Sequence, residues 1–169
     1  CAIRCTIMDT MIPIGISIMP TQRSTDIACL AKQAENLGFE SIWVPEQHTL
    51  PTQVSEPIPR LWGDIVDPLI ALARASVATT NLKLGTAVMV IPARNPITLA
   101  KEIATLDMYS SGRFLFGIGV GGLREEADVL GVDFDHRWTQ AKEATEEMKK
   151  LWIEEKSSYR GKYYKFPPL

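Results

Sequence analysis

Short apolar runs rich in β-formers alternate with longer helical stretches, and this alternation restricts the fold more than any other feature of the sequence. The runs are 14–19 (IGISIM), 40–48 (ESIWVPEQH), 82–91 (LKLGTAVMVI) and 113–121 (RFLFGIGVG). Strands separated by helices pair in parallel through right-handed crossovers. Because the runs are almost wholly apolar, both faces of the sheet are expected to be covered. The sequence therefore predicts an α/β fold of four successive β-α units.

The intervening helices carry recognisable ends. Each of the first three begins with a residue that can cap the free N–H groups of its first turn: Ser24 or Thr25, Asp67, and Asn95. Proline follows the second and third caps, at the position where its missing N–H costs nothing. A fourth helix is expected around 138–152, where apolar residues recur at helical spacing, and the tail 159–169 predicts a hairpin or extended excursion.

The sheet can be completed in two ways, and the sequence alone does not choose between them. Four units can form a small doubly wound sheet, or they can be half of an eight-fold barrel, which typically needs about 250 residues. The chain has 169 residues, which is short for a complete barrel. A four-strand piece leaves pairing groups free at both edges. We therefore expect either a fragment of a longer protein or a homodimer, with residues 1–10 as a non-native or disordered leader and 11–169 as the folded part.

Composition excludes several classes of function. Lys and Arg number 18 against 20 Asp and Glu, a net charge of −2 that gives no case for a nucleic-acid or membrane-surface partner. No apolar run reaches the roughly 20 residues that span a bilayer. The 3 cysteines and 2 histidines lack metal-ligand spacing, so no metal site is predicted. A reduced, cytoplasmic setting and a small-molecule substrate are the expectations that remain.

The fourth run ends in glycines that spell G-x-G-x-x-G at Gly117, Gly119 and Gly122. A dinucleotide fingerprint also needs a second strand about 20 residues on that ends in an acidic residue. Here a helical stretch stands at that distance, which counts against the dinucleotide interpretation. The glycines then either allow close packing at the strand end or keep the mouth of a barrel open for a flat ring system.

Three segments together resemble the N-terminal half of the bacterial luciferase-like monooxygenase superfamily, most closely the branch that uses the deazaflavin coenzyme F420. They are SIWVPEQH (41–48), the long stretch from LKLGTAVMV to REEADVLGVDF (82–134), and YRGKYYKFPP (159–168). The resemblance implies a (β/α)8 TIM-barrel type fold with only about the first four β-α units present. It also implies coenzyme F420, or alternatively FMN, in the C-terminal mouth, with hydride or oxygen chemistry on a small organic substrate.

The resemblance places candidate catalytic residues after the second strand, at Glu46, Gln47 and His48. The family usually has a carboxylate followed directly by a histidine. In this chain Glu46 matches the carboxylate, Gln47 takes the place of the histidine, and His48 comes one residue late. Glutamine can hydrogen-bond a ring but cannot shuttle a proton. General acid-base catalysis at this position is therefore in question, and a solvated loop histidine is the alternative for His48.

The resemblance also implies cofactor contacts at the other strand ends, which are expected to converge on one concave face. In the GTAV segment it implies a non-proline cis peptide at Ala87–Val88 beneath the ring. Arg94 is either a surface residue or a partner for an anionic cofactor tail, and Arg124 with Glu125 either contacts the ligand or forms a charged first helical turn. The complete set of candidate cofactor residues is Met19, Thr86, Ala87, Val88, Gly119, Gly121, Arg124 and Glu125.

Three functions of different classes follow from these features. The first is a flavin- or deazaflavin-dependent oxidoreductase, and the second is a non-catalytic relative that serves as a structural or subunit partner. The third and weakest is a small nucleotide-binding α/β module. The residues between Gln47 and Gly63 form a long βα connection, which is expected to be either a lid over the mouth or an interface pad.

Overall fold

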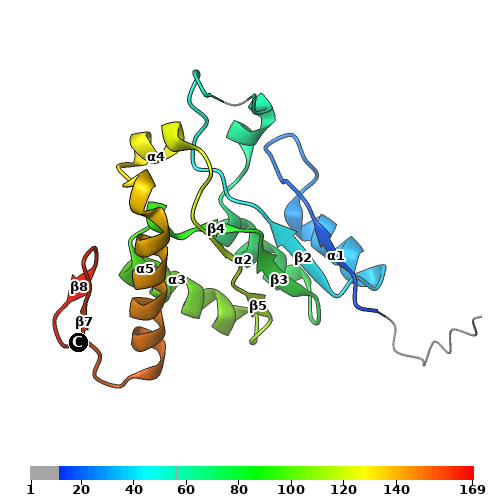
Figure 1. The fold of residues 1–169 in the computed structure, drawn as a ribbon. Helices are drawn as coiled ribbons and strands as arrows, with labels where there is room; N and C mark the ends of the chain where they lie inside the picture. Colours follow the sequence, from blue (N-terminus) through cyan, green and yellow to red (C-terminus); the bar gives the residue numbers. More distant parts are fainter. Residues whose placement is uncertain (1–11, 56) are drawn as a thin grey trace, which may run out of the picture.

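A parallel sheet forms the centre of the computed structural model, which describes residues 12–55 and 57–169 (Figure 1). The leader expected at 1–10 lies outside the described residues. The sheet has the order β1-β2-β3-β5, and every neighbouring pair is parallel. A doubly wound sheet reverses its strand order at a switch point, whereas this order runs in one direction, as in a barrel. Its strands are β1 Gly15–Ser17, β2 Ser41–Val44, β3 Lys83–Thr86 and β5 Phe114–Leu115.

Helices follow the strands in the predicted alternation. They are α1 Ile27–Asn36, α2 Pro68–Ala78, α3 Pro96–Tyr109, α4 Arg124–Leu130 and α5 Arg137–Ile153, with short 3-10 helices at Arg60–Asp64, Ile91–Ala93 and Phe134–His136. Helices α1, α2 and α3 pack side by side, and α5 packs on α3. The tail forms an antiparallel hairpin of β7 Tyr159–Arg160 and β8 Lys165–Phe166, which confirms the predicted excursion. No helix in the described part of the chain is long and apolar enough to cross a membrane.

Two of the three predicted helix caps are confirmed and one is wrong. The side chains of Asp67 and Asn95 accept hydrogen bonds from N–H groups in the first turns of α2 and α3, at 3.0 and 3.1 Å. The cap of α1 is Asp26, whose Oδ1 accepts from Ala28 N at 2.8 Å. Ser24 is unavailable because its hydroxyl accepts from Thr21 N at 3.0 Å and closes the preceding turn.

The observed strands are shorter than the apolar runs that predicted them. The run 40–48 stops being a strand at Val44, so Glu46, Gln47 and His48 lie in a loop after β2. The run 82–91 breaks after β3 at the Ala87–Val88 peptide, which is cis, as the family resemblance implied. It resumes as β4 Met89–Val90, which pairs in parallel with β6 Ile118–Gly119.

A threonine bridges the breaks in the third and fourth runs. The hydroxyl of Thr86 donates to Gly117 O at 2.8 Å and accepts from Gly117 N at 3.0 Å. Gly117 O also accepts from Met89 N at 2.8 Å, so what the threonine hydroxyl replaces is the backbone oxygen that Gly117 N would meet in a regular ladder. Because buried backbone groups must be paired, this contact allows the sheet to bend between β3 and β4 without leaving orphaned groups.

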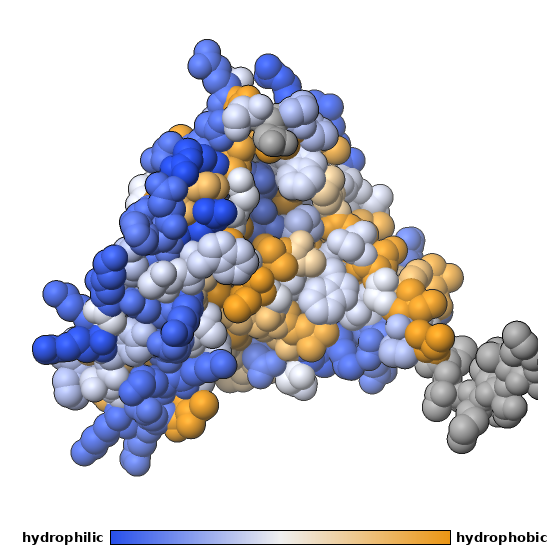
Figure 2. All heavy atoms as spheres, in the orientation of Figure 1, coloured by the Kyte–Doolittle hydropathy of each residue, from blue (hydrophilic) through white to orange (hydrophobic). Residues whose placement is uncertain are grey.

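The two faces of the sheet are covered differently. Ile42, Val44 and Leu84 point toward the helices and are buried in the main apolar core. On the other face the indole of Trp43 lies against Gly85, where a Cβ atom would meet the ring at 2.3 Å, and its Nε1 donates to Ser41 Oγ at 2.8 Å. Figure 2 shows apolar side chains gathered over the middle of the sheet on the side facing the viewer.

We expect Gly117→Ala to destabilise the fold. A Cβ atom at Gly117 would lie 2.0 Å from the backbone oxygen of Thr86, so the break between the two strand pairs must shift. The expected loss in the free energy of unfolding is about 1–3 kcal/mol, measured by urea denaturation. Gly122→Ala is the matched control, because nothing lies within 4 Å of its added Cβ. Equal stability of the two variants would contradict this account of the break.

Candidate functional site

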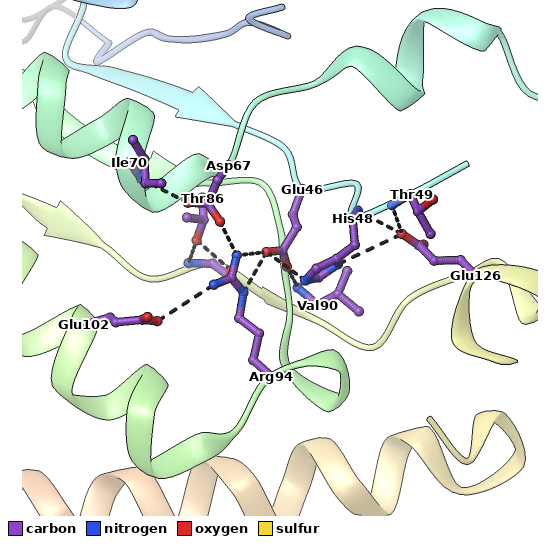
Figure 3. Close-up of polar contacts among 11 residues, drawn as sticks. Glu46, His48, Thr49, Asp67, Ile70, Thr86, Val90, Arg94, Glu102 and Glu126 are labelled. Atoms are coloured by element: carbon purple, nitrogen blue, oxygen red, sulfur yellow. Dashed lines mark hydrogen bonds and ion pairs between the residues drawn. The ribbon is translucent and has the colours of Figure 1, made fainter. Parts of the chain in front are cut away.

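Glu46 is the central residue of a polar cluster at the carboxyl edge of the sheet (Figure 3). Its side chain follows β2 by two residues, and the residue is only 9% exposed. One carboxylate oxygen accepts from Val90 N at 2.5 Å, and the other accepts from Arg94 Nε at 2.8 Å. Because the carboxylate is taken out of water, these bonds replace its lost hydration, and they tie the end of β2 to the end of β4.

Arg94 extends this cluster to two helices. Its Nη2 contacts Glu46 and lies 2.6 Å from Asp67 Oδ2, and its Nη1 lies 3.8 Å from Glu102 on α3. Burial lowers the pKa of Arg94, but the hydrogen bond to Asp67 and the charge of Glu46 outweigh it, and the pKa is raised. The guanidinium is therefore an internal ion-pair partner. Neither a surface position nor a free cofactor-tail contact, the two roles that the sequence suggested, describes it.

Asp67 has two roles in the same cluster. It caps α2 and also pairs with Arg94. Burial raises the pKa of Asp67, while hydrogen bonds from Ile70 N and from Arg94 lower it, and the net effect is a lowered pKa. The cap that fixes the start of α2 is thus joined to the end of β2 through one arginine.

His48 lies between two carboxylates in an exposed part of the loop after β2. Its Nε2 is 3.5 Å from Glu46 Oε1, its Nδ1 is 4.0 Å from Glu126 Oε1, and its side chain is 20% exposed. The backbone N–H groups of His48 and Thr49 both donate to Glu126 Oε1, at 2.9 and 3.1 Å. His48 is thus an exposed loop residue, as the alternative expected, and its ring also stands beside two carboxylates at the rim of the cluster.

Gln47 is separate from this arrangement. Its Nε2 donates to Thr49 O at 2.9 Å, so its amide holds the local loop and does not join Glu46 and His48. Of the three candidate catalytic residues, the structure brings together the first and the third.

The candidate cofactor residues of the third and fourth runs form a strip of small side chains next to the cis peptide. Ala87 and Val88 are exposed, and Gly119 packs so closely on Val88 that an added Cβ atom would meet it at 2.4 Å. Gly121 has a φ of 77°, a conformation that suits glycine. Thr86 is fully buried and its hydroxyl is bound to Gly117, so it supports the strip from beneath and offers no surface to a ligand.

The remaining candidates have partners within the protein or lie at the margin. Arg124 donates to Asp135 and lies over the ring of Phe134 at 4.4 Å from its centroid. Glu125 accepts from Ser55 N at 2.7 Å. Both belong to the first turn of α4, which agrees with the alternative of a charged helix start. Met19 follows β1 by two residues and is 38% exposed.

Glu126 is the site residue that the sequence did not single out for a role. It is 6% exposed, and its contacts with His48 cross 78 positions in the sequence. The only local signal was an acidic pair in the first turn of a helix after the glycines. Such pairs are common because they favour the positive end of the helix dipole, so this signal does not identify a partner.

A cavity of about 750 Å3 lies beside His48, lined by loop residues between His48 and Asp64. Apolar Leu50, Pro57 and Ile58 and charged Arg60 and Asp64 contribute to its wall. Within residues 12–55 and 57–169, no group of three or more His, Cys, Asp or Glu side chains is placed to hold a metal ion. The loop therefore borders a space of ligand size, and its role as a lid stays a prediction.

Comparison with known proteins points to one family. A family model described as luciferase-like monooxygenase matches residues 8–169. An uncharacterized protein of Mycobacterium tuberculosis is 35% identical over 164 residues, which cover 91% of this chain and 58% of that protein. The F420-dependent glucose-6-phosphate dehydrogenase of Kineococcus radiotolerans is 32% identical over 142 residues, covering 82% of this chain and 40% of that enzyme. The chain thus spans about half the length of these relatives.

A solved structure agrees with this match. The crystal structure of monooxygenase RslO1 from Streptomyces bottropensis superimposes with a TM-score of 0.81 at 26% sequence identity. The superposition covers 94% of this chain and 48% of that one.

We expect Arg94→Met to be strongly destabilising. It would leave the buried Glu46 carboxylate without its cationic partner, and breaking such a pair costs about 3 kcal/mol or more. Arg74→Met is the matched control, because Arg74 pairs with Asp26 at the exposed surface, where water screens the charges and the loss should be much smaller. Urea denaturation of both variants measures the contrast. A similar loss in the two would show that burial of the cluster does not matter.

Lowering the pH should remove the contribution that ionised Asp67 makes to the stability of the fold. Because the pKa of Asp67 in the folded chain lies below its ordinary value near 3.8, the ionised group stabilises the fold above that value, and the effect is lost as the pH falls below it. Asp67→Asn keeps a capping side chain but not the charge. The difference in thermal midpoint between wild type and this variant should shrink between pH 6 and pH 3. A difference that grows in acid would contradict the assignment.

Proposed function

Because this chain belongs to the luciferase-like monooxygenase family, we propose that it supplies the N-terminal half of an oxidoreductase that binds a deazaflavin or flavin in the mouth of a (β/α)8 barrel. The observation that carries the proposal is the meeting of two features at one sheet edge. The exposed strip at Ala87–Val88 and the Glu46–His48 cluster both follow the carboxyl ends of parallel strands. Barrel enzymes hold their chemistry at that end.

The strip fits a flat ring system. Ala87 and Val88 are exposed at the cis peptide, and the neighbouring Gly119 has no side chain to obstruct a planar ligand. Coenzyme F420 is the first candidate, since a relative covering 82% of this chain is named an F420-dependent dehydrogenase, and FMN is the second. When bound, the deazaflavin would supply hydride chemistry, and the flavin would supply hydride or oxygen chemistry. The chain supplies a floor beneath the ring and a polar cluster beside it.

The anionic tail of the cofactor needs partners outside this site. Arg94 is paired with Glu46 and Asp67, and Arg124 is paired with Asp135. Barrel enzymes often bind phosphate with the loops after their seventh and eighth strands. We therefore propose that the described residues hold the ring only, and that tail binding belongs to a second half of the barrel.

In this proposal His48 handles a proton and Glu46 fixes its ring. An imidazole can accept a proton at one ring nitrogen and give one up at the other, and the His48 ring is partly exposed at the rim of the cluster. Glu46 lies 3.5 Å from Nε2 and is itself held by Arg94 and Val90. Gln47, bound to Thr49 O, has no part in this step.

A non-catalytic relative is the second candidate. The glutamine at position 47, where the resembled family has histidine, favours it. So do the sheet edges: within the described residues, β1 and β5 each pair on one side only. Unpaired edges promote association, and we propose that the chain binds a second copy or a complementary half. This candidate predicts association without cofactor binding.

We expect Val88→Arg to weaken cofactor binding by at least tenfold while the chain stays folded, because the longer charged side chain would occupy the place of the ring. F420 and FMN are titrated separately into the purified chain by fluorescence, with its mass measured in solution. Wild-type binding is expected to be weak without tail contacts. Val77→Arg, on the exposed face of α2, is the control and should bind as wild type does. Equal binding by all three proteins refutes this placement, and no binding by wild type favours the second candidate.

A further inference from the structure

We propose that Glu126 is a positioning residue that sets both the backbone and the imidazole of His48. The proposal rests on the proposed function, in which His48 handles a proton. Glu126 is the third residue of α4 and is 6% exposed. A single oxygen, Oε1, accepts from His48 N at 2.9 Å and from Thr49 N at 3.1 Å (Figure 3). The start of the loop after β2 is therefore attached to α4 through one buried carboxylate.

The same oxygen also faces the ring. His48 Nδ1 lies 4.0 Å from Glu126 Oε1, which is beyond a hydrogen bond, so the carboxylate faces the ring without bonding to it. On the opposite side Nε2 lies 3.5 Å from Glu46 Oε1. The imidazole thus has a carboxylate on each side, one from the loop after β2 and one from the first turn of α4. The Glu46 charge is balanced by Arg94, whereas no Lys or Arg side chain in the described part of the chain pairs with Glu126.

This double contact separates Glu126 from the other glutamates that hold loops. Glu35 accepts from the backbone of 80–82, and Glu143 accepts from that of 162–164. Neither is paired with a histidine ring among the described residues. A second tie, from Ser55 N to Glu125 Oε1 at 2.7 Å, fixes the same loop farther along. Loop attachment is thus shared with Glu125, but of these four glutamates only Glu126 also faces the imidazole of His48.

The position of Glu126 in the chain gives this contact a functional consequence. Gly119 and Gly121, which border the proposed ring site, precede it by seven and five residues. One short segment therefore fixes the floor of the ring site and the orientation of His48. Catalytic groups must be held close to their productive geometry by neighbouring contacts. Glu126 provides that restraint between the ring and the proton-handling group.

The test compares Glu126→Gln, Glu126→Ala and the control Asp128→Asn in the free chain. Asp128 is exposed on the same helix and does not contact the loop. Amide exchange at His48 and Thr49 reports on the backbone bonds. The NMR resonances of the His48 ring report on its surroundings, and they are identified because the chain has only 2 histidines and His136→Gln removes the other.

Glu126→Ala should speed exchange of both amides by roughly 10- to 100-fold, as expected when a hydrogen bond to a charged group is lost, and should shift the ring resonances. Glu126→Gln should keep most of the amide protection, because its amide oxygen can still accept, yet should shift the ring. A purely structural clamp would leave the ring unchanged in Glu126→Gln, and that result would overturn the proposal. So would unchanged amide exchange in Glu126→Ala.

Addition of F420 or FMN separates this proposal from the proposed function. If either cofactor binds, wild type should show a ligand-dependent shift of the His48 ring that Glu126→Gln alters and Asp128→Asn preserves. If no cofactor shifts the ring in any variant, the proposed function fails. The differences between the free variants would still decide whether Glu126 positions His48.

Discussion

The site depends on one buried carboxylate. Glu46 is almost completely removed from water, and an ion in that position must be paired. Its partners are the backbone of Val90, the guanidinium of Arg94 and, farther off, the ring of His48. Through Arg94 the pairing reaches Asp67 at the start of α2. The ends of β2 and β4 and the start of α2 are therefore held together by charge at the edge where the proposed function needs precision.

Glutamates repeat this arrangement elsewhere in the fold. Glu35 receives three backbone N–H groups from the connection before β3, and its pKa is lowered to about 2 by the hydrogen bond from Lys32 and by these N–H groups. Glu143 receives three from the turn of the hairpin β7–β8. Loops pay a conformational entropy cost when they are ordered. A carboxylate that accepts several N–H groups offsets this cost and leaves the loop backbone paired.

Sequence reasoning succeeded where the determining interaction is local. The order of strands and helices, the caps at Asp67 and Asn95 and the terminal hairpin all follow from periodicity or from neighbouring residues. The cis peptide at Ala87–Val88 was expected from the family resemblance. The pairing of His48 with Glu126 had no comparable signal, because it joins residues 78 positions apart.

The errors have the same origin. Ser24 has a side chain that can cap a helix, but its hydroxyl accepts a hydrogen bond from Thr21 N, and Asp26 caps α1 instead. The runs 82–91 and 113–121 are almost wholly apolar, so their composition did not reveal the breaks. Those breaks depend on how Thr86 and Gly117 meet across two strands, and that contact exists only once the sheet has formed.

The atoms around each glycine of 117–122 show which of them the structure requires. Gly117 is required by the backbone oxygen of Thr86 and Gly119 by the side chain of Val88, whereas Gly122 has open space around it. A pyrophosphate would need the N-terminus of the following helix as its anchor. In α4 the carboxylates of Glu125 and Glu126 stand in the first turn and accept from Ser55, His48 and Thr49. An anion at this position would meet two negative charges, so this helix start does not suit a pyrophosphate. The glycines instead allow close strand packing and form part of the exposed strip, which argues against the dinucleotide interpretation.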